Sequence, residues 1–171
     1  MLDLETGKFS WGEGFELYPG MSLEEFRKSK VFQCELKNPE DKNDMSKRSF
    51  CLREQTIDGF QMVVAVDISM FGYVEEIILS KPEYYNWPNW PKELTEKEYA
   101  LEILDYNRAF VRKQIEEGMV GKDIKVRSLQ SFADEWGGIG TACDFRDIPR
   151  VEAKIRYGNF GRGIRVLNHK K

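Results

Sequence analysis

The sequence predicts a single-domain α+β fold, in which an antiparallel β-sheet carries one long and one short α-helix on one face. Three observations indicate this class: Asp58-Gly59 between two strand-like runs, a long helical pattern that begins at Thr95, and the alternating segment 151–157. The chain has 171 residues and is 41% hydrophobic, which suffices for one normal core. We therefore take residues 1–171 as one domain with a basic tail at about 158–171.

The N-terminal part predicts a hairpin, a short helix and a loop. Residues 9–17 place apolar side chains on either side of two glycines, which favours a short β-hairpin. Ser22 and Glu25 form a capping-box pattern that predicts the short first helix. Residues 37–48, "KNPEDKNDMSKR", are almost wholly polar and predict a mobile surface loop.

The strongest strand signal lies between residues 49 and 80. The runs "SFCLREQTI" and "FQMVVAVDI" flank Asp58-Gly59, a dipeptide that tolerates positive φ at both centres of a tight turn. The segment "GYVEEIILS" follows and alternates partially, as a strand with one polar face does. These three segments predict an antiparallel meander.

A second capping box predicts the long helix. Thr95 and Glu98 mark its start, and Gly118 marks its end after about Glu117. Its apolar residues form two adjacent stripes, which together make a broad arc. Such an arc favours packing against a sheet.

The last third returns to strands, at roughly 124–132, 139–145 and 151–157. The segment "VEAKIRY" places four apolar side chains on one face and three charged side chains on the other. It is therefore expected to be an antiparallel strand with one solvent-exposed face. We interpret Gly137-Gly138 before it as a turn or bulge that redirects a strand.

The stretch "YYNWPNWP" between the strands and the long helix is a candidate binding segment. Its prolines bias the preceding residues toward extended conformations, so the segment is stiff before anything binds. Stiffly held tyrosine and tryptophan are frequent anchors of protein interfaces. The alternative is that these rings cover the edge of the core. The candidate anchors are Tyr84, Tyr85, Trp87 and Trp90.

The charge is unevenly distributed. The net charge is −3, but eight basic and two acidic residues stand between Arg146 and Lys171. This end therefore carries +6, and residues 1–145 carry −9. The acidic body, residues 1–145, favours a basic partner and disfavours binding of nucleic acid. The basic C-terminal end, with Phe160 between arginines, leaves RNA binding as an alternative.

Few types of catalytic chemistry fit the residue inventory. The single histidine, His169, stands third from the end of the chain, which disfavours a histidine base, a Ser-His-Asp site or a multi-histidine metal site. The three cysteines have no C-x-x-C spacing, which disfavours a disulfide framework and a thiolate zinc site, so we expect them in or near the core. The glycine segments lack both common phosphate-binding orders. We predict no catalytic residues, no metal and no cofactor.

A carboxylate-based alternative remains open. Four acids surround the segment "WGGIG", and they could serve an enzyme or a small-ligand pocket between the long helix and the sheet, together with Arg146. The simpler interpretation is that these acids are solvated turn and strand-end residues. The acids are Asp134, Glu135, Asp144 and Asp147.

The chain also shows neither an apolar run long enough for a membrane span nor a signal-peptide pattern at its start, so a cytoplasmic location is expected. The sequence does not indicate an oligomeric state.

Two stretches resemble bacterial immunity proteins that accompany polymorphic or contact-dependent growth-inhibition toxins. These are "GFELYPGMSLEEF" at 14–26 and "WGGIGTACDFRDIPRVEAKIRYG" at 136–158, together 36 of the 171 residues. The resemblance implies a cytosolic, non-catalytic protein that binds one toxin domain and blocks it. A basic domain such as a nuclease suits the acidic body, with Asp144 and Asp147 as acidic contacts beside the aromatic anchors.

Overall fold

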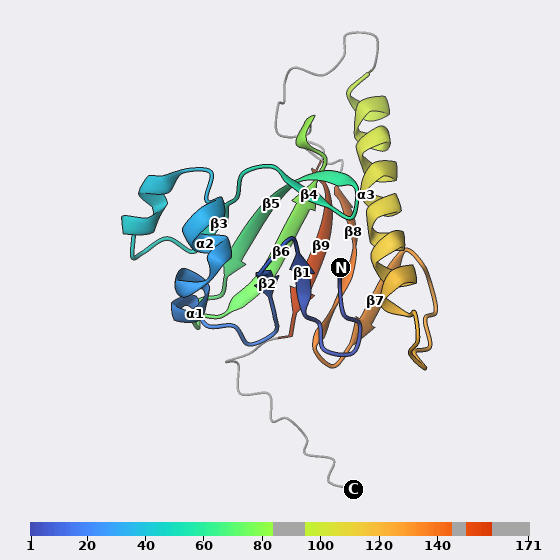
Figure 1. The fold of residues 1–171 in the computed structure, drawn as a ribbon. Helices are drawn as coiled ribbons and strands as arrows, with labels where there is room; N and C mark the ends of the chain where they lie inside the picture. The colour runs from blue at the N-terminus through green and yellow to red at the C-terminus, as the bar shows by residue number, and fades with distance from the viewer. Residues whose placement is uncertain (84–94, 145–149, 159–171) are drawn as a thin grey trace, which may run out of the picture.

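The structure, a computed structural model, describes residues 1–83, 95–144 and 150–158, and it confirms an α+β fold with antiparallel sheets and one long helix (Figure 1). The elements in chain order are β1 (Phe9–Trp11), β2 (Phe15–Leu17), α1 (Leu23–Lys28), α2 (Lys30–Glu35), the 3-10 helix η1 (Pro39–Asn43), β3 (Ser49–Cys51), β4 (Gln55–Ile57), β5 (Phe60–Ile68), β6 (Val74–Ser80), α3 (Glu96–Gly118), β7 (Ser131–Asp134), β8 (Gly137–Asp144) and β9 (Arg150–Tyr157).

The main sheet has the strand order β3-β5-β6-β9-β8-β7, and every neighbouring pair is antiparallel. β4 pairs with the first part of β5, so the turn at Asp58-Gly59 forms the predicted hairpin, with positive φ at both residues. β5 and β6 complete the predicted meander. β1 and β2 form the predicted N-terminal hairpin as a separate two-stranded sheet.

The β6–β9 pair joins the meander to the C-terminal strands. Its register places Ile77 opposite Ile155, and this pair belongs to a row of side chains that crosses the whole sheet. Every residue of that row is buried, so this face of the sheet forms one side of the core. The row is Phe50–Val66–Ile77–Ile155–Ile139–Phe132.

All three α-helices pack on this buried face. Phe26 of α1 and Phe32 of α2 contact Phe50 with ring centroids 5.4 Å away. α3 packs on β9, β8, β7 and β6, and Figure 1 shows it running along one side of the sheet while α1 and α2 lie at the opposite end. The N-terminal hairpin joins the same layer, because Trp11 Nε1 donates to Gln55 Oε1 at 3.0 Å.

The opposite face, which we call the open face, consists of the residues that alternate with the buried row. No α-helix in the described part of the chain packs on it. We define it by the rows Ser49–Asp67–Glu76–Arg156–Gly138–Ala133 and Cys51–Ala65–Ile78–Lys154–Gly140–Ser131 and by the pair Glu152–Ala142.

Both predicted helix starts are confirmed. Ser22 with Glu25, and Thr95 with Glu98, form complete capping boxes. The prediction of a single short helix was incomplete, because Ser29 ends α1 and its side chain caps a second short helix, α2. Serine supports both roles, since an extended Ser backbone stops one helix while its hydroxyl accepts an N–H of the next.

Two other expectations differ from the structure, and the predicted surface loop, most of which is exposed, contains a 3-10 helix. Residues 124–130 form turns and coil, and only Ser131–Asp134 pairs as a strand. The loop 37–48 contains η1 and is held by Arg27, which donates to the carbonyls of Lys42 and Asp44 at 3.1 and 2.6 Å. The three cysteines are free, but Cys34 and Cys143 are exposed rather than buried in the core.

The N-terminal segment crosses between the end of α3 and the β7–β8 turn. Leu2 N donates to the buried Gln114 Oε1 at 2.8 Å, and Trp136 Nε1 donates to Leu4 O at 2.8 Å. Gly118 makes this crossing possible, because a Cβ there would lie 2.7 Å from Leu4 Cγ and 2.9 Å from Leu2 O. Its role is therefore steric, since its φ is not positive.

Replacement of Gly118 by alanine tests this packing. Alanine has the better helix propensity, but the overlap with Leu2 and Leu4 is expected to lower the free energy of unfolding by about 1–3 kcal/mol in Gly118→Ala. Urea denaturation measures the change. Glu116→Ala, at an exposed position of the same helical turn, is the control and should change stability by less than about 0.5 kcal/mol. A stabilised Gly118→Ala would contradict the assigned crossing.

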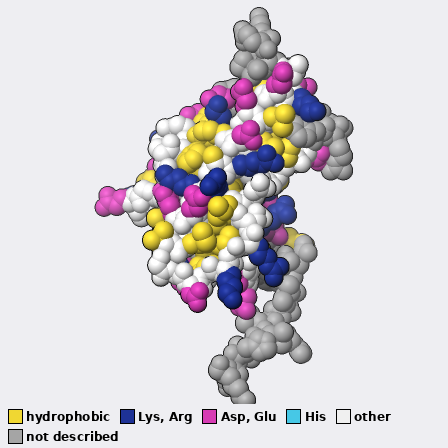
Figure 2. Space-filling view, turned by 90° about the vertical axis from the view of Figure 1, so that its right-hand side faces the viewer, with side chains coloured by type: hydrophobic (Ala, Val, Ile, Leu, Met, Phe, Trp, Pro, Cys, Tyr) yellow, Lys and Arg dark blue, Asp and Glu magenta, His cyan; other side chains and the backbone are white. Residues whose placement is uncertain are grey.

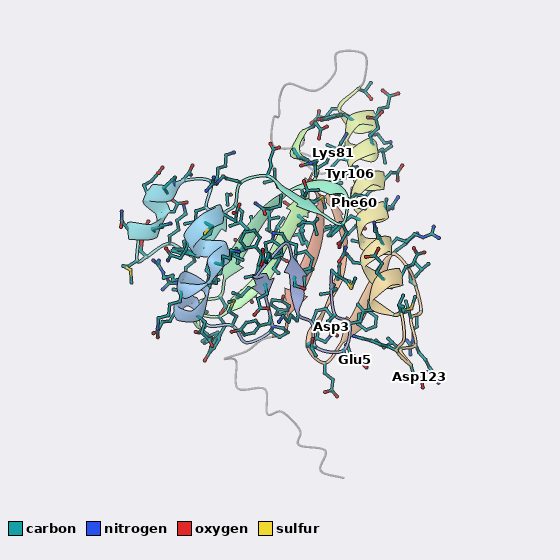
Figure 3. The ribbon with its side chains drawn as sticks, in the orientation of Figure 1. Asp3, Glu5, Phe60, Lys81, Tyr106 and Asp123 are labelled. Carbon is teal, nitrogen blue, oxygen red and sulfur yellow. The ribbon has the colours of Figure 1, made fainter. Side chains whose placement is uncertain are left out.

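The same segment contains an ion pair that makes the stability of the fold depend on pH. Lys122 Nζ lies 2.7 Å from Asp3 Oδ1 and 3.3 Å from Glu5 Oε2 (Figure 3 labels both acids). The hydrogen bond from Lys122 lowers the pKa of Asp3 below its usual 3.8, and the backbone N–H groups of Glu5 and Thr6 add to this effect.

A lowered pKa in the folded state means that Asp3 stabilises the fold above its unfolded pKa and loses this effect as the pH falls through the folded value. Asp3→Asn should therefore be less stable than the parent at pH 6. The difference should shrink steadily below about pH 4. Thermal melts of both proteins between pH 6 and pH 2 measure it, and a difference that is constant over this range would contradict the assignment.

Candidate functional site

Five of the six predicted contact residues lie outside the described residues. They are Tyr84, Tyr85, Trp87, Trp90 and Asp147. The sixth, Asp144, is half-buried at the end of β8, where its backbone pairs with that of Arg150.

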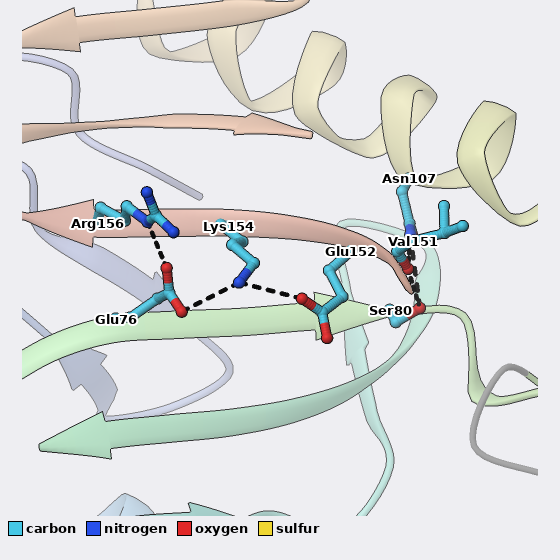
Figure 4. Close-up of polar contacts among 7 residues, drawn as sticks. All are labelled: Glu76, Ser80, Asn107, Val151, Glu152, Lys154 and Arg156. Atoms are coloured by element: carbon cyan, nitrogen blue, oxygen red, sulfur yellow. Dashed lines mark hydrogen bonds and ion pairs between the residues drawn. The ribbon is translucent and has the colours of Figure 1, made fainter. Parts of the chain in front are cut away.

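The described residues that flank the two predicted segments meet at one end of the sheet. β6 ends at Ser80, before the aromatic stretch, and β9 begins at Arg150. Ser80 Oγ donates to Val151 O at 3.1 Å, and Asn107 Nδ2 of α3 donates to the same carbonyl at 3.1 Å (Figure 4). Both side chains are fully buried. The segments that hold the predicted anchors and Asp147 therefore leave the described sheet at neighbouring points.

A second contact fixes α3 at this end. Tyr106 Oη accepts from Gln61 N at 2.8 Å and donates to Gln61 O at 3.1 Å, so it satisfies backbone groups of β5 beyond the end of β6. The Tyr106 ring packs edge-on against Phe60, and Lys81 lies over it at 5.5 Å (Figure 3 labels these three side chains). This arrangement supports the strand ends from which the aromatic stretch departs.

An ion network crosses the open face between β6 and β9. Lys154 Nζ lies 3.2 Å from Glu76 Oε2 and 3.1 Å from Glu152 Oε2, and Arg156 Nε donates to Glu76 Oε1 (Figure 4). The side chains of Glu76, Glu152 and Lys154 are only 14–18% exposed, whereas Arg156 is 70% exposed. The contact with Glu76 raises the pKa of the Arg156 guanidinium. The network is neutral and partly desolvated, which makes it a rigid part of the surface.

Asp67 stands next to this network, and none of the bases in residues 1–83, 95–144 and 150–158 forms an ion pair with it. Its Cα lies opposite that of Glu76, so two carboxylates face each other across β5 and β6. Its Oδ1 is buried and has no hydrogen-bond partner within the described part of the chain. The nearby bases on the β3 side are engaged elsewhere, because Lys47 pairs with Asp41 at 2.6 Å and Arg48 donates to carbonyls of its own loop. A partly buried carboxylate without a counterion lowers the stability of the free protein.

The far part of the open face is a shallow depression of about 460 Å³ over β8. Its floor is main chain, because Gly138, Gly140 and Ala142 occupy successive open-face positions, and Lys154 and Arg156 flank it. Gly138 is needed for close packing, since a Cβ there would lie 2.5 Å from Phe132 O. Gly140 has room, because its Cβ would be 3.4 Å from Ser131 Cβ.

The carboxylates near Trp136 do not converge in the described structure. Asp134 and Glu135 are exposed, and Asp134 Oδ1 accepts from Glu135 N within the turn. Trp136 is buried and packs edge-on against Tyr157. No group of three or more His, Cys, Asp or Glu side chains that could hold a metal ion occurs among residues 1–83, 95–144 and 150–158.

The α3 side of the molecule has a different electrostatic character. Figure 2 shows basic and acidic side chains interspersed with small apolar patches on this side. The helix pairs its own charges, as Arg108 does with Asp105 and Arg112 with Glu116 at 3.4 and 2.8 Å. Exposed pairs of this kind contribute little energy.

Sequence reasoning did not identify the open face as a site. The signal was present, because Asp67 is a single acid within the apolar run of β5, and because charged residues alternate with apolar residues in 151–157. The register that places Asp67 beside Glu76, and Glu76 beside Lys154 and Arg156, is a non-local feature and could not be derived from these patterns.

Comparison with protein-family models gives no match, and comparisons with curated proteins and with solved structures give none either. In the described parts of the chain, no helix has both the length and the apolar character needed to cross a membrane.

Removal of the Tyr106 hydroxyl tests the support of the strand ends. Tyr106→Phe keeps the ring contact with Phe60 but loses both bonds to Gln61, so the free energy of unfolding should fall by about 1 kcal/mol. Hydrogen exchange of the Gln61 amide should accelerate more than that of the Leu52 amide, which bonds to Val64 O and serves as the internal control. Equal acceleration at both amides would contradict a local role.

Proposed function

We propose that this chain is a non-catalytic protein-binding module of the immunity type, which acts in the cytoplasm by binding a basic toxin domain and blocking it. The observation that carries the proposal is the asymmetry of the main sheet. One face holds all three α-helices and the N-terminal hairpin, while the open face presents a mixed apolar and charged surface with the uncompensated Asp67. Interfaces combine an apolar centre with specifically placed charges in this way.

The charge of the body supports a basic partner. The last thirteen residues, 159–171, carry four basic and no acidic residues, so residues 1–158 carry −7. Opposite net charges increase the rate of association with a cationic domain, and acidic side chains can take the place of substrate phosphates in a nuclease. The predicted anchors Tyr84, Tyr85, Trp87 and Trp90 would add contacts at the sheet end where their segment departs.

Affinity capture with the tagged full-length chain, followed by mass spectrometry, identifies the partner. We expect one basic protein that re-forms a 1:1 complex when both components are purified and that loses its toxic activity in the complex. The association rate should fall about tenfold or more between low and physiological salt, because screening weakens the attraction. Recovery of no protein partner, combined with turnover of a small substrate by the chain itself, would overturn the proposal.

A further inference from the structure

We propose that the open face around Asp67 is the docking site for a cationic side chain of the partner, an arginine or lysine flanked by apolar residues. This inference rests on the proposed function and names the surface and the chemistry that it recognises. It starts from the electrostatic imbalance of one row of the sheet.

The imbalance is local and specific. In the row Ser49–Asp67–Glu76–Arg156, Arg156 and Lys154 are already paired with Glu76, and Lys154 also pairs with Glu152. Among the described residues of this surface, the three carboxylates of Asp67, Glu76 and Glu152 outnumber the two cations Lys154 and Arg156, and Asp67 is the acid left without a cation. A guanidinium or ammonium group placed beside the partly exposed Asp67 carboxylate would supply the missing positive charge.

The surroundings of Asp67 suit the rest of such a segment. The next row places Ala65 and Ile78 directly beside Asp67 and Glu76, and Ala65 is only 7% exposed. This apolar strip lowers the local exposure to water, which strengthens a charge contact at its edge. Beyond Lys154, the depression over Gly140 leaves space for a bulky side chain or a length of main chain from the partner.

Asp67 thus lowers the stability of the free protein and is proposed to raise the affinity of the complex. A residue with only a structural role would not combine these opposite effects, because its removal would lower stability. This difference provides the test.

The probe is a terminally blocked heptapeptide of alternating valine and arginine, titrated into the isotope-labelled full chain and followed by amide chemical shifts. We expect shifts at Ala65, Asp67, Glu76 and Gly140 and none along α3. The same peptide with glutamate in place of arginine should not bind. Equal binding of the two peptides, or shifts confined to α3, would overturn the proposal.

Asp67→Asn is the decisive variant. It should weaken the arginine peptide at least about fivefold, as loss of a charged contact does, while raising the midpoint of thermal unfolding by about 1–4 °C. Glu102→Gln changes the net charge equally at an exposed position of α3 and is the matched control, with unchanged affinity. Unchanged affinity in Asp67→Asn would overturn the docking site without affecting the capture of a toxin partner by another surface.

Two further variants complete the test. Gly140→Val fills the depression at a position that has room for a Cβ, and it should weaken binding of the arginine peptide without loss of folding.

A chain that ends after Gly158 tests whether the protein's own C-terminal residues, and not a partner, occupy the open face. If it bound the peptide about tenfold more tightly than the full chain, the protein's own basic end would be the occupant, and the partner would be excluded from that role.

Discussion

The antiparallel pairing of β6 with β9 is the contact on which the rest of the structure depends. These strands are more than seventy residues apart in sequence, and their register joins the N-terminal meander to the C-terminal strands. It aligns Ile77 with Ile155 in the buried row and Glu76 with Arg156 in the adjacent open row. A slip by one residue would move the isoleucines to the open face and the charges into the core, so burial of the apolar row specifies the register.

The position of α3 follows from this pairing. Its apolar arc covers the junction of β6, β9 and β8, and three of its polar side chains bond main-chain groups of other elements. Asn107 contacts Val151 O beside Ser80, Tyr106 bonds the Gln61 main chain, and Gln114 accepts from Leu2 N. Buried amides that make such bonds fix the orientation of the helix more strictly than apolar contacts alone, because a lost bond leaves a buried polar group unsatisfied.

Buried polar atoms without a partner among the described residues occur on both sides of the sheet: Arg27 Nε, Asn107 Oδ1 and Tyr157 Oη on the helix side, and Asp67 Oδ1 on the open face. On the helix side, ion pairs such as Lys122 with Asp3 and Arg112 with Glu116 match acids with bases. On the open face, the network around Lys154 is matched internally, but Asp67 is not. Proteins place carboxylates without a counterion mainly where a further interaction uses them, and Asp67 gives the open face its proposed role.

The sequence by itself determined the local elements: both capping boxes, the positive-φ turn at Asp58-Gly59, and the alternation of 151–157, because each depends on residues close together in the chain. It misassigned 124–130 as strand and placed Cys34 and Cys143 in the core, since apolar character in a short window does not reveal which neighbours cover it. Only the tertiary structure decided the strand order, the steric need for Gly118 beside Leu4, and the meeting of Asp67 with Glu76. These features arise from pairing between distant segments, and the free energy that selects one pairing comes from burying the common core.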